Sequence, residues 1–336
     1  MNRTTENLES AWPHRLAVVL VCATFPLIWV GGLVTTYDAG MAVEDWPTTY
    51  GYNLFLYPWR TWILGPWDLF IEHGHRLLGA TVGLISMALL LTVWLRDKRS
   101  SVRWLAVAVF AAVCFQGLLG GLRVLFDERL LAKIHGCFGP AFFALCVAMA
   151  AVTSRRWRTQ QRLPRSARPG VQGLALVTTL LAYAQIVLGA QLRHVTGAWA
   201  PAMFRMAVLF HLLVAALLLI DIVWLAVRVA RRAAGDGWLL RPALALPLLV
   251  GLQVSLGAGA WVLNYGWPAW IADRPWAAGF VVVQESQRQA LVTTAHVAVG
   301  SLILATSLLV FLRAWRLEGE SRLALPVGSA RLEALV

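Results

Sequence analysis

Charged residues are scarce in this sequence, and that scarcity excludes an ordinary soluble protein. Asp, Glu, Lys and Arg together make up 14% of the 336 residues, whereas apolar residues make up 59%. A soluble domain carries about 25% charged residues, so the composition predicts a membrane protein with several spans. The net charge of +12 does not indicate a nucleic-acid partner, because the basic residues collect in short segments between apolar stretches.

Cysteine is also rare, and its placement excludes several kinds of site. The four cysteines, Cys22, Cys114, Cys137 and Cys146, all fall inside apolar stretches. None belongs to a Cys-x-x-Cys-His motif, which excludes covalent attachment of a c-type heme. None lies in an outer loop, so no disulfide is required. A cleavable signal is not expected either, because the first apolar run starts near Arg15 and is long enough to span.

Eight apolar stretches are long enough to cross a bilayer, which requires about 20 residues per helix. The sequence therefore predicts an all-α membrane protein with eight transmembrane helices. They are expected at about 14–36, 71–95, 103–122, 131–153, 171–192, 204–228, 241–264 and 289–314. Asp221 is the one charge that interrupts the sixth stretch.

The basic residues also predict the orientation, since cytoplasmic segments of membrane proteins are enriched in Lys and Arg. With the N-terminus inside, most of the 29 Lys and Arg residues fall on the cytoplasmic side, including the arginine-rich segment at 155–168. Both termini are therefore predicted to be cytoplasmic, in a multi-pass protein of the inner cell membrane.

A weak internal repeat divides the chain into two halves of four helices. Gln116, Gln185 and Gln253 each stand four residues before a glycine near the end of an odd-numbered stretch. Small residues there permit close helix approach, and such duplication often builds one site per half. We predict two pseudo-repeated four-helix bundles. The expected domains are 1–153, a basic cytoplasmic linker at 154–170, a second half at 171–314 and a cytoplasmic tail at 315–336.

Four histidines mark the same place in the even-numbered stretches. They are His75, His135, His211 and His296, each near the start of its stretch. A histidine inside the membrane is costly and suggests a function, and the predicted topology places all four toward the outer face. Two histidines on facing helices of a bundle are a suitable axial pair for heme iron. The sequence predicts two bis-histidine heme sites, although packed core histidines, a zinc site and a proton relay are alternatives.

The segment Glu72-His73-Gly74-His75-Arg76 packs four ionisable groups into five residues. Glu72 precedes His75 by three residues, so the two share a helix face. A carboxylate beside a heme can exchange protons during chemistry, but acidic residues near helix N-termini are also common because the helix dipole favours them. His73 points to nearly the opposite face and is expected at the membrane interface.

Two arginines are candidates for contacts with heme propionates. Arg76 adjoins His75, and Arg193 ends the fifth stretch. A guanidinium group binds carboxylates well, and lipid headgroups are an alternative partner for Arg76. The roles of His73, His194 and Asp221 stay open.

Taken in order, these motifs resemble those of the heme A synthase family. The resemblance extends over about residues 14–314. It rests on Gly31-Gly32-Leu33-Val34, Asp45-Trp46-Pro47, the Glu72–Arg76 segment, Gln116–Gly121, Lys133-Ile134-His135, Leu188–His194 and the two later histidines. The chain departs from many bacterial members in lacking a cysteine pair in the first outer loop, and its Thr35–Met41 stretch differs from the commoner pattern.

The resemblance implies an oxidoreductase that converts the C8 methyl of heme O into a formyl group by successive hydroxylations, giving heme A for cytochrome oxidase. It implies that His75 and His135 hold the substrate heme O. It also implies that His211 and His296 hold a resident heme b and that Glu72 acts at the oxidised methyl. The implied partners are the bilayer, a heme O synthase that delivers the substrate, and an electron acceptor that the sequence does not name. A homo-oligomer is compatible with the sequence.

Two other functions fit the same histidines. A diheme b-type electron-transfer protein that oxidises quinol uses the same ligands, but such carriers usually place their hemes at opposite leaflets and need no carboxylate beside a ligand. A heme transporter or chaperone would bind heme reversibly and would need no second, permanently held heme.

Overall fold

The computed structural model describes residues 10–164, 169–195 and 199–318, and these ranges are helical apart from loops and one isolated β-bridge between Thr49 and Tyr52. Most of the predicted tail and residues 165–168 of the predicted linker lie outside the described residues. Eight long helices follow one another along the chain. They are α1 Trp12–Thr36, α3 Trp67–Arg96, α4 Ser100–Leu125, α5 Arg129–Thr153, α7 Gln172–Arg193, α8 Pro201–Arg232, α9 Gly237–Tyr265 and α11 Gln287–Glu318.

Each of these eight helices is long and apolar enough to cross a membrane. The predicted all-α class and the eight spans are therefore confirmed, and the chain is a multi-pass membrane protein. Several helices extend a turn beyond the predicted ends, because charged residues at the interface still continue the helix. On α11, for example, Arg313 and Arg316 donate to the backbone carbonyls of Trp238 and Trp157, so the helix runs past residue 314 to Glu318.

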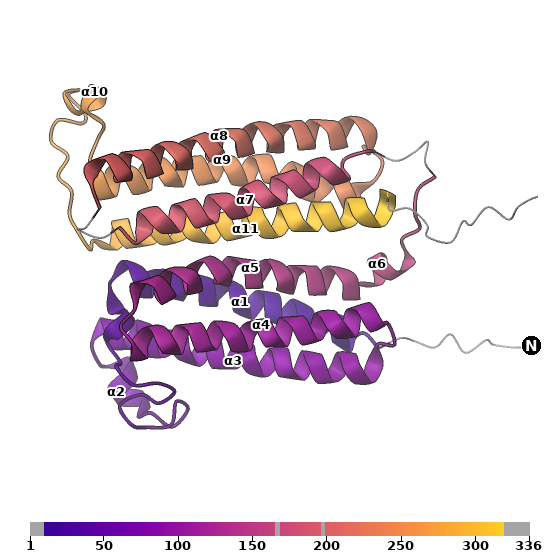
Figure 1. Ribbon diagram of the computed structural model, residues 1–336, viewed down its shortest axis with the longest axis horizontal. Helices are drawn as coiled ribbons and strands as arrows, with labels where there is room; N and C mark the ends of the chain where they lie inside the picture. Colours follow the sequence, from indigo (N-terminus) through magenta and orange to yellow (C-terminus); the bar gives the residue numbers. More distant parts are fainter. Residues whose placement is uncertain (1–9, 165–168, 196–198, 319–336) are drawn as a thin grey trace, which may run out of the picture.

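The long helices form two groups of four (Figure 1). In the first group, the N-terminal bundle, contacts run in a ring from α1 to α3, α4, α5 and back to α1. In the second, the C-terminal bundle, the ring runs from α7 to α8, α9, α11 and back to α7. Each ring places its second and fourth helices diagonally opposite each other, so α3 faces α5 and α8 faces α11.

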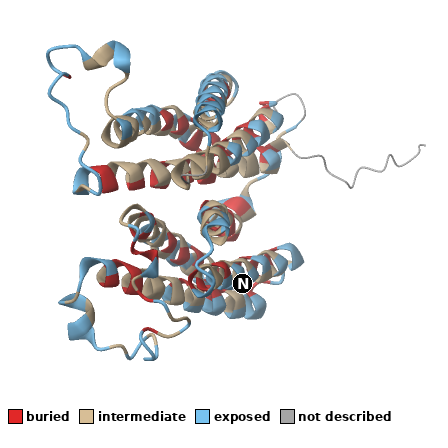
Figure 2. Ribbon diagram, turned by 60° about the vertical axis from the view of Figure 1, so that its left-hand side comes forward, coloured by how far each residue is buried: buried red, intermediate tan, exposed pale blue. Residues whose placement is uncertain are grey.

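The two bundles share an apolar interface. Helix α11 contacts α1 and α5, and α5 also contacts α7. Phe25 and Phe143 of the N-terminal bundle pack into the same core cluster as Ile303 and Leu304 of α11. Figure 2 shows buried residues where helices face one another and exposed residues on the outer faces, which in a bilayer would meet lipid. Helices α5 and α11, which each carry one of the predicted histidines, are the most buried of the eight.

Two long loops lie at one end of the molecule. The loop after α1 contains the 3-10 helix Ala39–Met41 and α2 Trp59–Ile63, and the loop after α9 contains α10 Ala269–Ala272. In Figure 1, α2 and α10 lie at the left, whereas α6 Arg155–Thr159 lies at the right, where α5 ends. Helices α3, α5, α8 and α11 all start at the end that carries α2 and α10.

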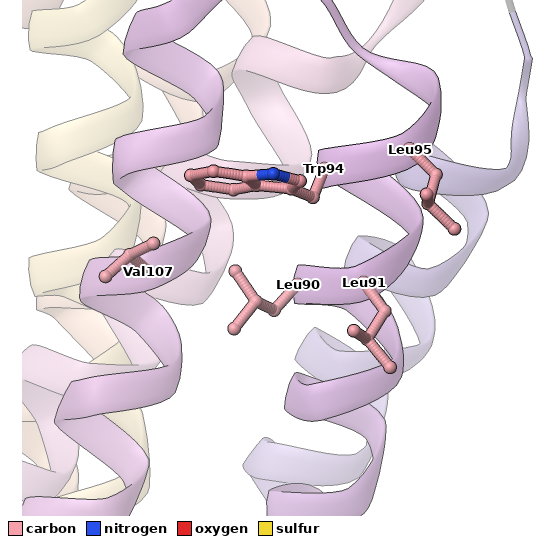
Figure 3. A pocket seen from close by; sticks show the side chains of 5 residues that line it. All are labelled: Leu90, Leu91, Trp94, Leu95 and Val107. Atoms are coloured by element: carbon pink, nitrogen blue, oxygen red, sulfur yellow. The ribbon is translucent and has the colours of Figure 1, made fainter.

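A groove lies on the outside of the N-terminal bundle near the end of α3, and Figure 3 shows the side chains that line it. It has a volume of about 290 Å³ and lies between α3 and α4. Its lining consists of uncharged side chains, Leu90, Leu91, Trp94, Leu95 and Val107. Such a surface suits a lipid chain and offers no group for chemistry.

Candidate functional site

The structure brings the four predicted histidines together in two pairs. The imidazole centroids of His75 on α3 and His135 on α5 lie 6.3 Å apart. Those of His211 on α8 and His296 on α11 lie 6.4 Å apart. An imidazole nitrogen bonds a metal at roughly 2 Å, so two rings on opposite sides of one ion have centroids roughly 6 Å apart. Both pairs therefore have the spacing that one iron between them requires.

A glycine on the neighbouring helix faces each of these rings. A Cβ added to Gly31 would lie 2.7 Å from His75 Cε1, and one added to Gly189 would lie 3.4 Å from His211 Cε1. The other two pairs are Gly120 with His135 and Gly257 with His296, each at 3.0 Å. These glycines end the odd-numbered spans noted in the sequence. Their lack of a side chain lets each imidazole sit between the helices.

Backbone carbonyls fix the protonation of two of the rings. Nδ1 of His135 lies 3.1 Å from the carbonyl oxygen of Gln116, and Nδ1 of His296 lies 3.1 Å from that of Gln253. A carbonyl only accepts, so Nδ1 must carry the proton. The lone pair is then on Nε2, which is how metal-binding histidines are usually oriented. In His296 this nitrogen also lies 3.4 Å from the side-chain Nε2 of Gln253, which donates to it.

Glutamine side chains contact some of the four histidines, but not His75. Gln116 donates from Nε2 to the backbone oxygen of His135 at 3.0 Å, and Gln185 does the same for His211 at 3.0 Å. Leu27 occupies the corresponding place before Gly31 on α1, so no glutamine side chain reaches the ring of His75 from there.

The donor set favours a ligand that brings its own metal. Among the described residues, no group of three or more His, Cys, Asp or Glu side chains could hold a metal ion. Two imidazoles alone leave a metal ion short of ligands, whereas in a heme the macrocycle supplies the remaining ones. Paired histidines in a four-helix bundle, with glycine beside each ring, fit such a group.

Glu72 lies in the interior beside the first pair. Its side chain is on α3, the residue is only 1% exposed, and both carboxylate oxygens are hydrogen-bonded. Oε2 accepts from the backbone N–H of Val43 at 2.9 Å, and Oε1 accepts from Nη2 of Arg76 at 2.9 Å. Glu72 therefore does not simply cap a helix in water. It is a buried carboxylate paired with a guanidinium.

Arg76 attaches the loop after α1 to α3. Besides Glu72, it donates from Nη2 to the carbonyl of Val43 at 2.6 Å. Its Nη1 donates to the carbonyls of Asp45 at 2.6 Å and Thr48 at 3.0 Å. These four bonds use all the N–H groups of the two terminal nitrogens. Only Nε–H is left for the propionate contact predicted from the sequence.

His73, which the sequence places at the membrane interface, is covered by protein and does not face the surroundings. His73 is 1% exposed and its Nδ1 lies 3.0 Å from the hydroxyl of Thr49. The rings of Tyr57 and Trp62 lie 5.0 and 5.3 Å from it. The loop after α1 folds back over this face of α3 and buries it, which the helical periodicity alone could not reveal.

Asp45 organises the turn within that loop. Its carboxylate accepts hydrogen bonds from the hydroxyl of Thr48 and from the backbone N–H groups of Tyr50 at 2.7 Å and Gly51 at 2.9 Å. Gly51 has φ +79°, a conformation that glycine adopts without strain. Burial raises the pKa of Asp45, but these hydrogen bonds outweigh it and lower the pKa below its ordinary value. The turn is therefore built around a carboxylate anion.

Arg123 was missed by the sequence analysis. It lies in the last turn of α4, and its Nη2 donates to the carbonyl of Gly40 at 3.2 Å. The available signal was its position three residues after Gly120, the glycine that faces His135. Residues three apart share a helix face.

Arg193 lies at the junction of the two bundles. From the end of α7 it donates through Nη2 to the carbonyl of Gly32 at 2.6 Å and to the hydroxyl of Thr36 at 2.7 Å, both on α1. A second polar contact across the junction joins Lys133 to Gln191 at 3.0 Å. Arg193 therefore connects the bundles, whatever else it binds.

Asp221 lies away from both histidine pairs. It follows His211 by ten residues on α8, which is about 15 Å along a helix. Its Oδ2 accepts from the hydroxyl of Thr178 on α7 at 2.5 Å. This contact joins two neighbouring helices within the C-terminal bundle and does not reach the site.

Comparisons with known proteins agree with this arrangement. A family model described as "Cytochrome oxidase assembly protein" matches residues 67–207, which include Glu72 and the first histidine pair. The heme A synthase of Shouchella clausii is 27% identical over 62% of this chain and 75% of its own length. The heme A synthases of Symbiobacterium thermophilum and Exiguobacterium sibiricum are 30% and 26% identical, and the matches span 56% and 62% of those proteins and 52% and 56% of this chain. The family model and these relatives together show that the chain is similar to heme A synthases over much of its length.

Proposed function

We propose that this protein is a heme A synthase, an oxidoreductase that converts the C8 methyl of heme O into a formyl group. Successive hydroxylations would give a hydrated aldehyde, which loses water. The observation that carries the proposal is the asymmetry of two similarly spaced histidine pairs. Only the first has a buried carboxylate three residues before a histidine, as substrate chemistry would need.

In this proposal His75 and His135 bind the iron of heme O, and Glu72 acts on the substrate. Oxidation at the methyl carbon develops positive charge there, which a nearby carboxylate stabilises. The N–H of Val43 and the guanidinium of Arg76 keep that carboxylate in one orientation. The loop that supplies Val43 also covers the outer end of α3, which helps to exclude water from this region.

We propose that His211 and His296 bind a resident heme b. Nδ1 of His296 donates to the carbonyl of Gln253, so Nε2 carries the lone pair that would bind the iron in place of its 3.4 Å contact with Nε2 of Gln253. When bound, heme b supplies one-electron redox chemistry. Arg193 is placed close enough to α1 to connect this bundle with the first, and its remaining N–H groups are candidates for a propionate contact.

The proposal includes the arrangement in the membrane. The two bundles would be pseudo-repeats, comprising residues 1–153 and 171–314 with the basic linker 154–170 between them. The identical ring order of the helices and the four glycine–histidine contacts support this. The distribution of Lys and Arg supports cytoplasmic termini in the inner membrane, with both heme sites toward the outer face. Heme O synthase as the supplier, a separate electron acceptor and a homo-oligomeric assembly are further parts of the proposal.

Mass spectrometry of extracted hemes tests this function. The chain is expressed in a host that makes heme O but lacks its own heme A pathway. Heme A or its hydroxylated precursor is expected with the chain and absent without it. A folded protein that contains only heme b while heme O is available would overturn the proposal in favour of a diheme electron carrier. Reversible heme binding with no permanently held heme would favour a transporter.

A further inference from the structure

The last turn of α4 uses three positions to build the first site. Gly120 faces the ring of His135, and Gly121 leaves room for the indole of Trp46, which a Cβ there would overlap. Arg123 follows one turn after Gly120, and its guanidinium lies where a Cβ of Gly40 would be. This turn therefore holds the outer loop and the histidine at the same time, and it brings a cation between them.

The guanidinium of Arg123 has unused hydrogen-bonding capacity. Among the described residues, its one hydrogen bond is the donation from Nη2 to Gly40, and it belongs to no ion pair. By contrast, Arg76 has used all the N–H groups of its terminal nitrogens. The side chain of Arg123 is half-buried. A guanidinium that is partly removed from water is stabilised by a carboxylate or by several carbonyls.

The charges around Arg123 show which site it belongs to. It interacts electrostatically with Glu72 and Arg76 and also with both histidines of the first pair. The carboxylate of Glu72 is already paired with Arg76. Asp38 and Asp127 also attract Arg123, but none of the three carboxylates forms an ion pair with it among the described residues.

We propose that Arg123 binds a propionate carboxylate of the substrate heme and so selects which methyl group faces Glu72. This inference rests on the proposed function. A macrocycle held only by two axial histidines can rotate about the axis between them or insert with either face forward. A fixed guanidinium distinguishes the edge that bears carboxylates from the other edges. The oxidation then falls on one methyl and not on its counterparts.

The second pair has no arginine at the equivalent position of α9, and its candidate propionate contact, Arg193, belongs to α7. The position three residues after Gly257 on α9 is Ala260. A resident heme that is not modified needs no selection among its methyl groups. The arginine is thus present where regiochemistry matters and absent at the corresponding place where it does not.

Binding of heme O and of its dimethyl ester to the full-length protein in detergent tests this. Esterification removes both propionate charges and leaves the rest of the macrocycle. Absorbance titrations would compare the natural chain with Arg123→Gln, Arg123→Lys and the matched control Arg60→Gln, an exposed arginine in the same loop region. His75→Ala establishes that the titration reports the first pair, since it should abolish the signal.

Arg123→Gln is expected to weaken binding of heme O roughly 10-fold or more, the range of a charge-assisted hydrogen bond, and to leave ester binding unchanged. Arg123→Lys should recover part of the loss, and Arg60→Gln should match the natural chain. Equal weakening of acid and ester would mean that Arg123 only supports the loop, and no change for either ligand would remove it from the site. Both results overturn the inference even if the natural chain makes heme A.

Product analysis gives an independent readout of selection. The natural chain should yield one formyl isomer, whereas Arg123→Gln should yield a mixture of positional isomers. A single isomer from the variant would contradict the assigned role. Conversely, a charge-dependent loss of binding in a chain that never forms heme A would support Arg123 as a propionate ligand and reject the proposed oxidation.

Discussion

The two histidine pairs have the same arrangement of helices and glycines, and they differ in the side chains around the rings. In both, the rings come from diagonal helices and pack against glycines of their neighbours. Around the first pair, α3 carries Glu72 and Arg76. The equivalent positions beside His211 on α8 are Val208 and Leu212, and Leu212 is 58% exposed. The shared helices and glycines give both pairs a spacing that suits a metal between two imidazoles. The polar side chains found only beside the first pair would determine the chemistry there.

The two long loops differ in what they hold in place. The loop after α1 is attached to α3 through Arg76 and to α4 through Trp46, and it buries His73. Both loops leave large apolar side chains exposed, Trp59 by 62% in the loop after α1 and Trp270 by 77% in the loop after α9. The difference between the loops is therefore in their polar contacts with the helix that carries the histidine, and not in the exposure of their aromatic residues.

The largest expected effect is the loss of heme from the second site while the first site is unchanged, or the reverse. His211→Ala or His296→Ala should remove the resident heme b, because one axial ligand is lost from a buried pair. His75→Ala should leave that heme in place. The heme-to-protein ratio and the absorbance spectrum of the purified protein measure this. An unchanged spectrum in both C-terminal variants would reject the assignment of the second pair.

A second prediction separates binding from chemistry at the first site. Glu72→Ala should retain heme binding and lower the rate of heme A formation roughly 10²- to 10³-fold, the usual effect of removing an electrostatic stabiliser. Glu72→Gln keeps the size and can still accept from the N–H of Val43, so it isolates the charge. Mass spectrometry of the hemes reports the rate. Full activity in both variants would mean that Glu72 takes no part in the reaction and only interacts favourably with the helix dipole.

Much of this comparison could be predicted from the sequence. Helical periodicity and apolar length predicted eight spans, and the recurrence of histidine near the start of alternate spans predicted which residues pair. The glycines were noted, but their contact with the rings requires knowledge of which helices are neighbours. The burial of His73 and the position of Arg123 depend on how the first outer loop folds over α3 and α4. A loop without periodicity gives little warning of its path, so these tertiary contacts were missed.

A third prediction applies the same substitution to both bundles. In Gly31→Ala the new Cβ would lie 2.7 Å from His75, whereas in Gly189→Ala it would lie 3.4 Å from His211, an ordinary contact. Displacing a ring from its rotamer costs about 0.5–1.5 kcal/mol. Gly31→Ala should therefore weaken heme O binding several-fold, and Gly189→Ala should leave heme b occupancy nearly intact. Equal effects at the two sites would mean that the helices adjust and the glycines do not seat the rings.

The smallest expected effect is a change with pH in the stability of the loop after α1, with the loop after α9 as the comparison. Because the folded pKa of Asp45 lies below its ordinary value of 3.8, the unfolded loop binds a proton more readily than the folded one. The stability that Asp45 contributes is therefore fully present above pH 3.8 and is lost as the pH falls through the lowered folded value. Asp45 is partly exposed, so the effect should be modest.

Hydrogen exchange at Tyr50 and Gly51, whose N–H groups donate to this carboxylate, should show protection at pH 5 that falls toward pH 3, after correction for the intrinsic exchange rate. Asp45→Asn should show weaker protection at both values, whereas Asp273→Asn in the second loop should leave the first loop unchanged. Protection that is independent of pH in the natural chain would mean that Arg76 and Trp46 alone hold the first loop in place.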